Sequence, residues 1–147
     1  MAITQAMCTL FKKDLLLGDH HLDTDDIRIA LYTSSASLDA STDAYTTSNE
    51  ITNTSGSAYV AAGQQLTSVA VAETSTSGVF DSADPEWTSA TFTARGALIY
   101  NKTLYDSDNT RGAIAVLNFG GDFTVSGGTF KIVFPAATAS NAIVRID

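Results

Sequence analysis

The second half of the chain is a succession of short apolar runs, separated by glycine and by polar residues. From residue 87 to residue 146 the runs read WTSATFT, GALIYN, AIAVLNF, TFKIVF and NAIVRI. Each run is too short for a helix of ordinary length and is rich in β-branched or aromatic residues, as β-strands are. This half therefore predicts an antiparallel all-β body. With the strands of the first half, about eight are expected, which favours a two-sheet sandwich or jelly roll over a barrel around a ligand.

The first half of the chain contains further predicted strands, and turn-forming residues lie between the predicted strands of both halves. IRIALYT alternates in the way of a strand with one buried face, and AYVAA and QLTSVAV are expected as strands on either side of a tight turn or bulge at Gly63. Pro85 belongs in a loop, and Gly96 allows a bulge or a sharp corner. YDSDNTRG and GGDFTVSGG are interpreted as turn-rich connections between strands, the second with Phe123 and Val125 as anchors.

One substantial helix is expected, over about residues 4–17. Its apolar stripe recurs at three- and four-residue steps and consists of Ile3, Met7, Leu10, Phe11 and Leu15. Thr4 is the expected N-cap, and Gly18 the residue just past the C-terminus. The stripe must be covered, either by the chain's own sheet or by a neighbouring subunit.

A long polar segment, about residues 34–57, follows the first expected strand. It is dominated by turn formers and hydroxyl residues, and Tyr45 and Ile51 are its expected anchors to the body. A segment of this length without periodicity is either a binding loop that reaches a neighbour or a flexible surface connection. Because strands resume directly after it, residues 1–147 are expected to form a single domain.

Composition restricts the partners. The chain has 147 residues, eight Lys and Arg against sixteen Asp and Glu, and a net charge of −8, which disfavours contact with a phosphate backbone or an anionic membrane. Only Lys12 and Lys13 are adjacent, and a solvated helix face is the preferred interpretation of that pair. No apolar run reaches the ~18 residues of a membrane span. No nucleic-acid and no membrane partner is therefore expected.

The single cysteine and the amino terminus indicate where the chain is made. Cys8 has no intrachain partner, and its apolar surroundings predict a small buried side chain rather than a reactive thiol. The first residues carry their charges in the middle and lack the architecture of a signal peptide. Synthesis in a reducing cytoplasm is expected.

Two clusters could carry chemistry. His20 and His21 lie with Asp23, Asp25 and Asp26 in DHHLDTDD, where a polar surface loop is preferred over weak Ca²⁺ or Zn²⁺ binding because the spacing is not that of an EF-hand.

The second cluster, Asp81, Asp84 and Glu86, lies beside Pro85 and Trp87. An acidic loop with a packing tryptophan is preferred over a glycosidase pair or over carbohydrate recognition by exposed Trp87 and tyrosines. No nucleophile elbow, zinc-protease pair or phosphate loop occurs, so no enzyme activity, catalytic residue, cofactor or metal is expected. The sequence assigns no partner-binding residues.

The whole-length pattern resembles small virion structural proteins of tailed bacteriophages. The stretches that carry the likeness are MAITQAMCTLFKKDLLLGDH, IRIALYTSSASL, TARGALIYN, AVLNFGG and TFKIVFPAATASNAIVRI. They span nearly all of the chain and contain no catalytic motif.

The resemblance implies a capsid decoration, or cement, protein made in the host cytoplasm and located in the virion. Such a protein docks in many copies on the major capsid protein, as a homo-oligomer that is often a trimer. The alternative is a tail, fibre or adaptor component that connects virion parts or recognises a host-surface glycan. A third hypothesis is a polysaccharide-processing enzyme that uses the acidic loops.

Overall fold

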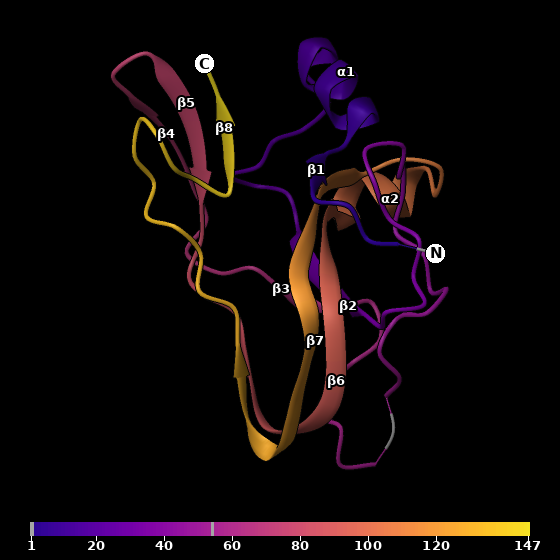
Figure 1. Ribbon diagram of the computed structural model, residues 1–147. Coiled ribbons are helices and arrows are strands. Elements are labelled where there is room, and N and C mark those ends of the chain that lie inside the picture. Colours follow the sequence, from indigo (N-terminus) through magenta and orange to yellow (C-terminus); the bar gives the residue numbers. More distant parts are fainter. Residues whose placement is uncertain (1, 54) are drawn as a thin grey trace.

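The computed structural model describes residues 2–53 and 55–147, so residue 54 of the predicted polar segment lies outside the described residues. Its strands form two antiparallel sheets, one in the order β1-β7-β6-β2-β3 and one in the order β4-β5-β8, with a helix near the N-terminus (Figure 1). The eight-stranded all-β prediction is confirmed. The elements are β1 (Ala6–Met7), α1 (Thr9–Leu17), β2 (Ile27–Tyr32), β3 (Gln64–Gln65), β4 (Ala70–Thr74), β5 (Ser77–Asp81), β6 (Glu86–Asn101), α2 (Lys102–Ser107), β7 (Ala113–Lys131) and β8 (Val144–Ile146).

The long pair β6–β7 is the centre of the fold. WTSATFT and GALIYN are one continuous strand, and the expected connection GGDFTVSGG is wrong, because it continues β7 opposite β6. The pairing of the two strands continues through this segment because β7 contains a bulge. Gly96 pairs with Asn118 and Ala94 pairs with Phe123, so the single residue Arg95 on β6 lies opposite residues 119–122 on β7. Bulges bend a ribbon, and β6–β7 turns back on itself at the bottom of Figure 1.

The N-terminal helix is shorter than its periodicity predicts. Residues 4–8 are not helical, because Ala6 and Met7 pair with β7 and the Thr4 backbone N–H donates to the Leu38 carbonyl at 2.8 Å. Thr4 is therefore not the N-cap. The end of α1 is as predicted, since Gly18 takes the left-handed conformation with φ 77°. Sheet pairing overrides the helical pattern wherever the backbone groups find partners on another strand.

Several local predictions need correction. AYVAA forms no strand, and QLTSVAV contributes only to the ends of β3 and β4. The connection YDSDNTRG contains part of α2, which begins after Asn101 because the Asn101 side chain accepts a hydrogen bond from the Leu104 N–H at 3.1 Å. Gly63 lies in a tight turn with φ 78°, as expected, and Pro85 lies in a loop between β5 and β6.

The polar segment is held down by buried side chains. Tyr45 stacks on Tyr100 at a ring distance of 4.9 Å, and Ile51 is buried, so both predicted anchors are confirmed. The sequence reasoning missed the strongest attachment, the buried carboxylate of Glu50. It accepts hydrogen bonds from the hydroxyls of Tyr45 at 2.5 Å and Tyr59 at 2.6 Å. The segment is thus packed on the body along much of its length.

Candidate docking surfaces

The two adjacent histidines point to different environments. His20 is 8% exposed, packs edge-on against Phe11, and its Nδ1 lies 3.3 Å from the Asn101 side-chain nitrogen. Burial lowers the pKa of His20, and the nearby carboxylate of Asp14 opposes this shift. His21 is exposed. The preferred interpretation of a polar surface loop therefore holds for His21 but not for the buried His20.

The aspartates of the same loop are used for structure. Asp25 accepts hydrogen bonds from the Asn101 side chain at 2.6 Å and from the His21 backbone N–H at 2.9 Å. Asp26 pairs with Arg28 at 3.0 Å, and Asp23 is exposed. Over residues 2–53 and 55–147, no three side chains of His, Cys, Asp or Glu are grouped so that they could hold a metal ion.

Asp14, a buried residue of α1, has a cationic partner from a distant part of the chain. Arg111 lies 3.0 Å from Asp14 and 2.5 Å from Asp19. This arrangement fastens α1 to the segment before β7. Cys8 is fully buried as predicted, and burial raises the pKa of its thiol to about 12, which keeps it protonated and unreactive.

The second acidic cluster does not form a carbohydrate site around tryptophan. Trp87 is only 6% exposed and packs near Tyr59 and Phe92, so the alternative of an exposed Trp87 is wrong. Asp84 accepts a hydrogen bond from the Phe134 backbone N–H at 2.9 Å. Tyr32, Tyr59 and Tyr100 are also fully buried and present no ring to a sugar.

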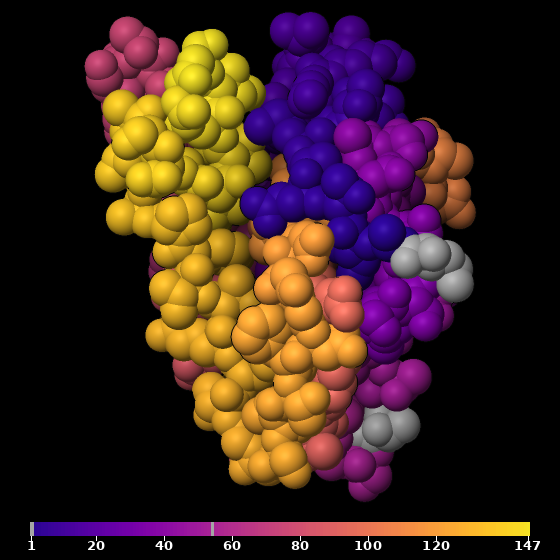
Figure 2. Space-filling view, viewed as in Figure 1, coloured from indigo at the N-terminus to yellow at the C-terminus, as the bar shows by residue number. Residues whose placement is uncertain are grey.

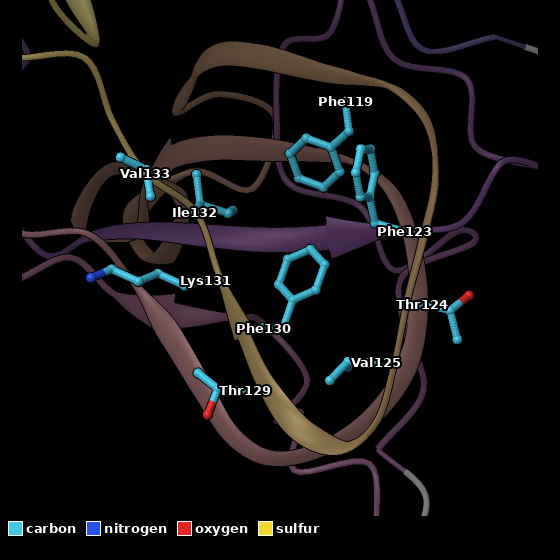
Figure 3. Close-up of a pocket in the computed structure, with 9 residues that line it drawn as sticks. All are labelled: Phe119, Phe123, Thr124, Val125, Thr129, Phe130, Lys131, Ile132 and Val133. Carbon is cyan, nitrogen blue, oxygen red and sulfur yellow. The ribbon is translucent and has the colours of Figure 1, made fainter.

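An apolar groove lies on the inner side of the bend in β6–β7. It has a volume of about 430 Å³, and its apolar lining, here called the β6–β7 groove, consists of Phe119, Phe123, Val125, Phe130, Ile132 and Val133. Figure 3 shows the rings of Phe119, Phe123 and Phe130 gathered on this inner side while Thr124 points away. Phe123 and Val133 are 54% and 74% exposed. A groove of this composition is typical of a binding surface.

The groove is continuous with the core through aromatic contacts. Phe130 lies 6.0 Å from Trp87 and 5.1 Å from Phe92, and Phe119 lies 6.1 Å from Phe130. Phe123 lies 6.3 Å from Phe119 at the open end. Because one side of the groove is built on buried rings, its shape is set by the fold and not by mobile side chains.

The glycine-rich connection contributes Phe123 and Val125 to this groove, and the predicted strand TFKIVF contributes Phe130, Ile132 and Val133. Val125 packs partly against the core, as an anchor does, but Phe123 is more than half exposed, so its predicted role as an anchor is wrong. A phenylalanine between glycines indicates an apolar contact.

A second apolar surface is the outer face of α1, defined here as Lys12, Lys13, Leu16 and Leu17. Leu16 is 90% exposed and Leu17 is 63% exposed, although Phe11 on the same helix is fully buried within the chain. The helix projects at the top of the molecule, and the bent ribbon forms its lower part (Figure 2). Of the predicted stripe, Ile3 and Phe11 are buried within the chain, whereas Met7, Leu10 and Leu15 are only half-buried.

The charges of this face are distinctive in a chain of net charge −8. Six of the eight Lys and Arg lie within 4.0 Å of a carboxylate, namely Arg28, Arg95, Lys102, Arg111, Lys131 and Arg145. Among the residues that the structure describes, Lys12 and Lys13 make no such pair. The outer face of α1 thus combines two exposed leucines with two lysines that form no ion pair within 4.0 Å, although Lys13 lines surface hollows together with Asp14, Asp19, Asp43 and Asp108.

Further large apolar side chains are exposed away from both surfaces. They are Val60, Val71 on β4 and Ile146 on β8. Neither helix in the described parts of the chain is long and apolar enough to cross a membrane.

No protein-family model, no curated protein and no solved structure matches this chain. The fold and its surfaces define a two-sheet β-protein with a packed interior and several open apolar surfaces.

Proposed function

We propose that this protein is a non-enzymatic capsid decoration, or cement, protein of a tailed bacteriophage. It binds the outside of the head in many copies, through contacts with the major capsid protein. The proposal rests on the resemblance of the sequence to small virion proteins and on the surface of the structure.

The observation that carries the proposal is the distribution of exposed apolar side chains. The interior is closed, yet large apolar residues are exposed on α1, at the β6–β7 groove and on the smaller sheet, at Leu16, Val133 and Val71 respectively. A contiguous exposed apolar surface, such as the β6–β7 groove, marks an interaction site, whereas single exposed apolar residues are ordinary. Each contact is weak alone, but a symmetric shell repeats it many times, and the linked contacts hold the protein in place.

The action of such a protein is mechanical. Surface buried across the seams between capsid subunits opposes the expansion that packaged DNA causes, because expansion would expose that surface to water again. The acidic surface fits this location, since a protein of net charge −8 does not compete for the packaged nucleic acid.

The test uses capsids that lack the protein. We expect them to lose integrity at a lower temperature and pressure than complete capsids, and to recover when the purified protein is added. Binding is measured by co-sedimentation, and the copy number by quantitative gel analysis of the particles. Capsids that neither bind the protein nor gain resistance would overturn the proposal.

Copy number separates cement from the tail, fibre or adaptor alternative. Hundreds of copies spread over the head support cement. A handful at one vertex or on the tail would instead support the alternative and reject a cement role.

A further inference from the structure

We propose that the β6–β7 groove binds an apolar, acidic segment of the major capsid protein. Apolar side chains of that segment lie among the phenylalanine rings, and a carboxylate of the same segment pairs with the Lys131 ammonium at the side of the groove. This inference rests on the proposed function, and it names the surface and the partner chemistry that hold the protein on the head.

The groove leaves a contiguous apolar surface open to solvent. Its six apolar side chains come from β7 and the two residues after it, and Phe123 and Val133 are 54% and 74% exposed. Such a surface gains free energy when apolar side chains of a partner cover it. The volume of about 430 Å³ lies in the range of roughly 300–1,000 Å³ that is usual for ligand sites. The groove therefore takes the side chains of a segment and not a whole domain.

An irregularity of β7 brings the two halves of the groove to the same side. Between its pairs with Thr91 and Ala90, β7 contains one extra residue, Gly127, whose φ of 63° favours glycine. Side chains alternate along a strand, so one extra residue inverts the alternation. As a result, Phe123 before this residue and Phe130 after it face the same side (Figure 3). The groove thus exists before any partner binds.

The charge of the groove selects an anion. Among the described residues that line it, Lys131 alone is charged, although the whole chain has sixteen acidic and eight basic residues. The Lys131 ammonium lies 4.0 Å from Asp84, which is beyond hydrogen-bond distance. The other ion pairs in the described parts of the chain are 2.5–3.0 Å long. The ammonium can therefore donate hydrogen bonds to a carboxylate of a partner.

The carboxylates near the groove have other contacts. Asp122 pairs with Arg95 at 2.8 Å, and Asp84 accepts a hydrogen bond at 2.9 Å from a backbone N–H just after β7. Glu86, opposite Lys131 on β6, lines a different hollow. None of these three carboxylates is part of the described lining of the groove. A carboxylate that enters the groove therefore meets an ammonium and no like charge in the lining.

The position of Lys131 separates the acidic end of the partner from its apolar end. Figure 3 shows the Lys131 side chain extending away from the rings of Phe119, Phe123 and Phe130. The net charge of −8 repels a polyanion such as a nucleic acid. A single carboxylate beside apolar side chains, in contrast, matches both the ammonium and the rings.

The first test uses the purified chain and sodium octanoate, a carboxylate with an apolar tail, as the probe. Two-dimensional NMR should show saturable binding, with shifts confined to residues 119–134 and their partners on β6. 1-Octanol, which has the same tail without the charge, should bind roughly threefold more weakly. Lys131→Gln should remove this difference. Lys102→Gln, which removes a lysine paired with Asp106 on α2, is the matched control and should keep it.

The second test measures co-sedimentation with capsids that lack the protein. Phe123→Asp should bind at least about tenfold more weakly than the parent chain, and Lys131→Gln roughly threefold more weakly. Lys131→Arg should bind like the parent chain, because it keeps the charge. Val60→Asp, at a position that is 63% exposed and outside the groove, is the control for the added carboxylate.

The variants change exposed side chains and should keep the fold, which circular dichroism checks. Added salt should weaken capsid binding of the parent chain more than that of Lys131→Gln, because only the parent chain has the ammonium at the groove.

The outcomes separate this inference from the proposed function. A parent chain that does not bind capsids rejects the proposed function and this inference with it. A parent chain that binds capsids no better than Phe123→Asp and Lys131→Gln do rejects this inference alone. Octanoate shifts outside the groove, or equal binding of octanoate and 1-octanol by the parent chain, also reject it.

Discussion

The hydroxyl of Tyr59 donates a hydrogen bond to the buried carboxylate of Glu50 at 2.6 Å and also accepts one from the Leu31 backbone N–H at 3.0 Å. This single hydroxyl therefore links the polar segment, the loop before β3 and the central sheet. Burial raises the pKa of Tyr59, so the hydroxyl keeps the proton it donates. The polar segment is thereby held against the central sheet.

Removal of the Glu50 carboxylate should strongly destabilise the fold. Glu50→Ala leaves the hydroxyls of Tyr45 and Tyr59 and the Ala62 N–H without their acceptor. We expect a loss of about 3 kcal/mol in the free energy of unfolding, measured by urea denaturation. Glu73→Ala, at an exposed position of β4, should change it by less than about 0.5 kcal/mol. Equal effects of the two substitutions would contradict the assignment.

The turn at Gly63 should tolerate no side chain. A Cβ at this position would lie 2.1 Å from the Ile29 carbonyl oxygen, at a φ of 78°. Gly63→Ala should therefore cost more than about 3 kcal/mol or prevent folding, because backbone must move on both sides.

The matched control for this turn is Gly56→Ala. Gly56 has a similar φ of 85°, but a Cβ there meets nothing within 4 Å. We expect a cost of only about 1 kcal/mol for the left-handed conformation. Thermal unfolding of the two variants, compared with the parent chain, separates the steric effect from the conformational one.

Two ion pairs of similar length should differ in their effect on stability. Arg111→Met leaves the carboxylate of Asp14, which is 3% exposed, without its cation, and we expect a loss of about 3–5 kcal/mol. Arg95→Met breaks the solvent-exposed pair with Asp122 and should cost less than about 1 kcal/mol. Chemical denaturation at neutral pH measures both, and a larger effect at Arg95 would refute this ranking.

Stability should fall as the pH drops below the ordinary pKa of histidine. Burial lowers the pKa of His20 from 6.5, opposed by Asp14, so the unfolded chain binds this proton more readily than the folded chain. The contribution is complete above pH 6.5 and is lost as the pH falls through that value, until His20 is also protonated in the folded state.

Unfolding free energies between pH 5 and 8 test this dependence. His20→Gln should reduce the slope with pH, whereas His21→Gln, at an exposed position, should retain it. Other charged groups around His20 are Asp14, Asp19, Asp25 and Arg111, so the comparison is made between variants and not from the parent curve alone. A slope unchanged by His20→Gln would assign the pH dependence to those groups.

Local patterns were enough to establish the fold class. IRIALYT and the short runs of the second half correctly predicted β2 and much of β6 and β7 as strands. The expectation of a single buried face for β2 was wrong, because consecutive residues of this central strand are buried on both faces of the sheet. Gly18, Gly63 and Pro85 were placed correctly, since the backbone restrictions of these residues depend little on tertiary contacts. The burial of Cys8 followed from its apolar neighbours.

Local patterns failed where distant segments compete for the same backbone groups. The apolar periodicity predicts a helix from residue 4, yet Ala6 and Met7 pair with β7, so α1 begins only at Thr9. GGDFTVSGG has the composition of a turn, but the long partner strand β6 holds it in a bulged ladder. The spacing of apolar residues along the chain does not indicate which backbone groups will form hydrogen bonds with a distant strand.

The amino-acid sequence by itself determined an acidic, disulfide-free, antiparallel β-protein with one N-terminal helix, because charge, cysteine count and alternation are properties of neighbouring residues. Only the tertiary structure decided that Trp87 is buried and Phe123 exposed, and that Leu16 and Leu17 on α1 are exposed. Burial is settled by which distant segments pack together. The bend of β6–β7 alone turns a set of phenylalanines into a groove.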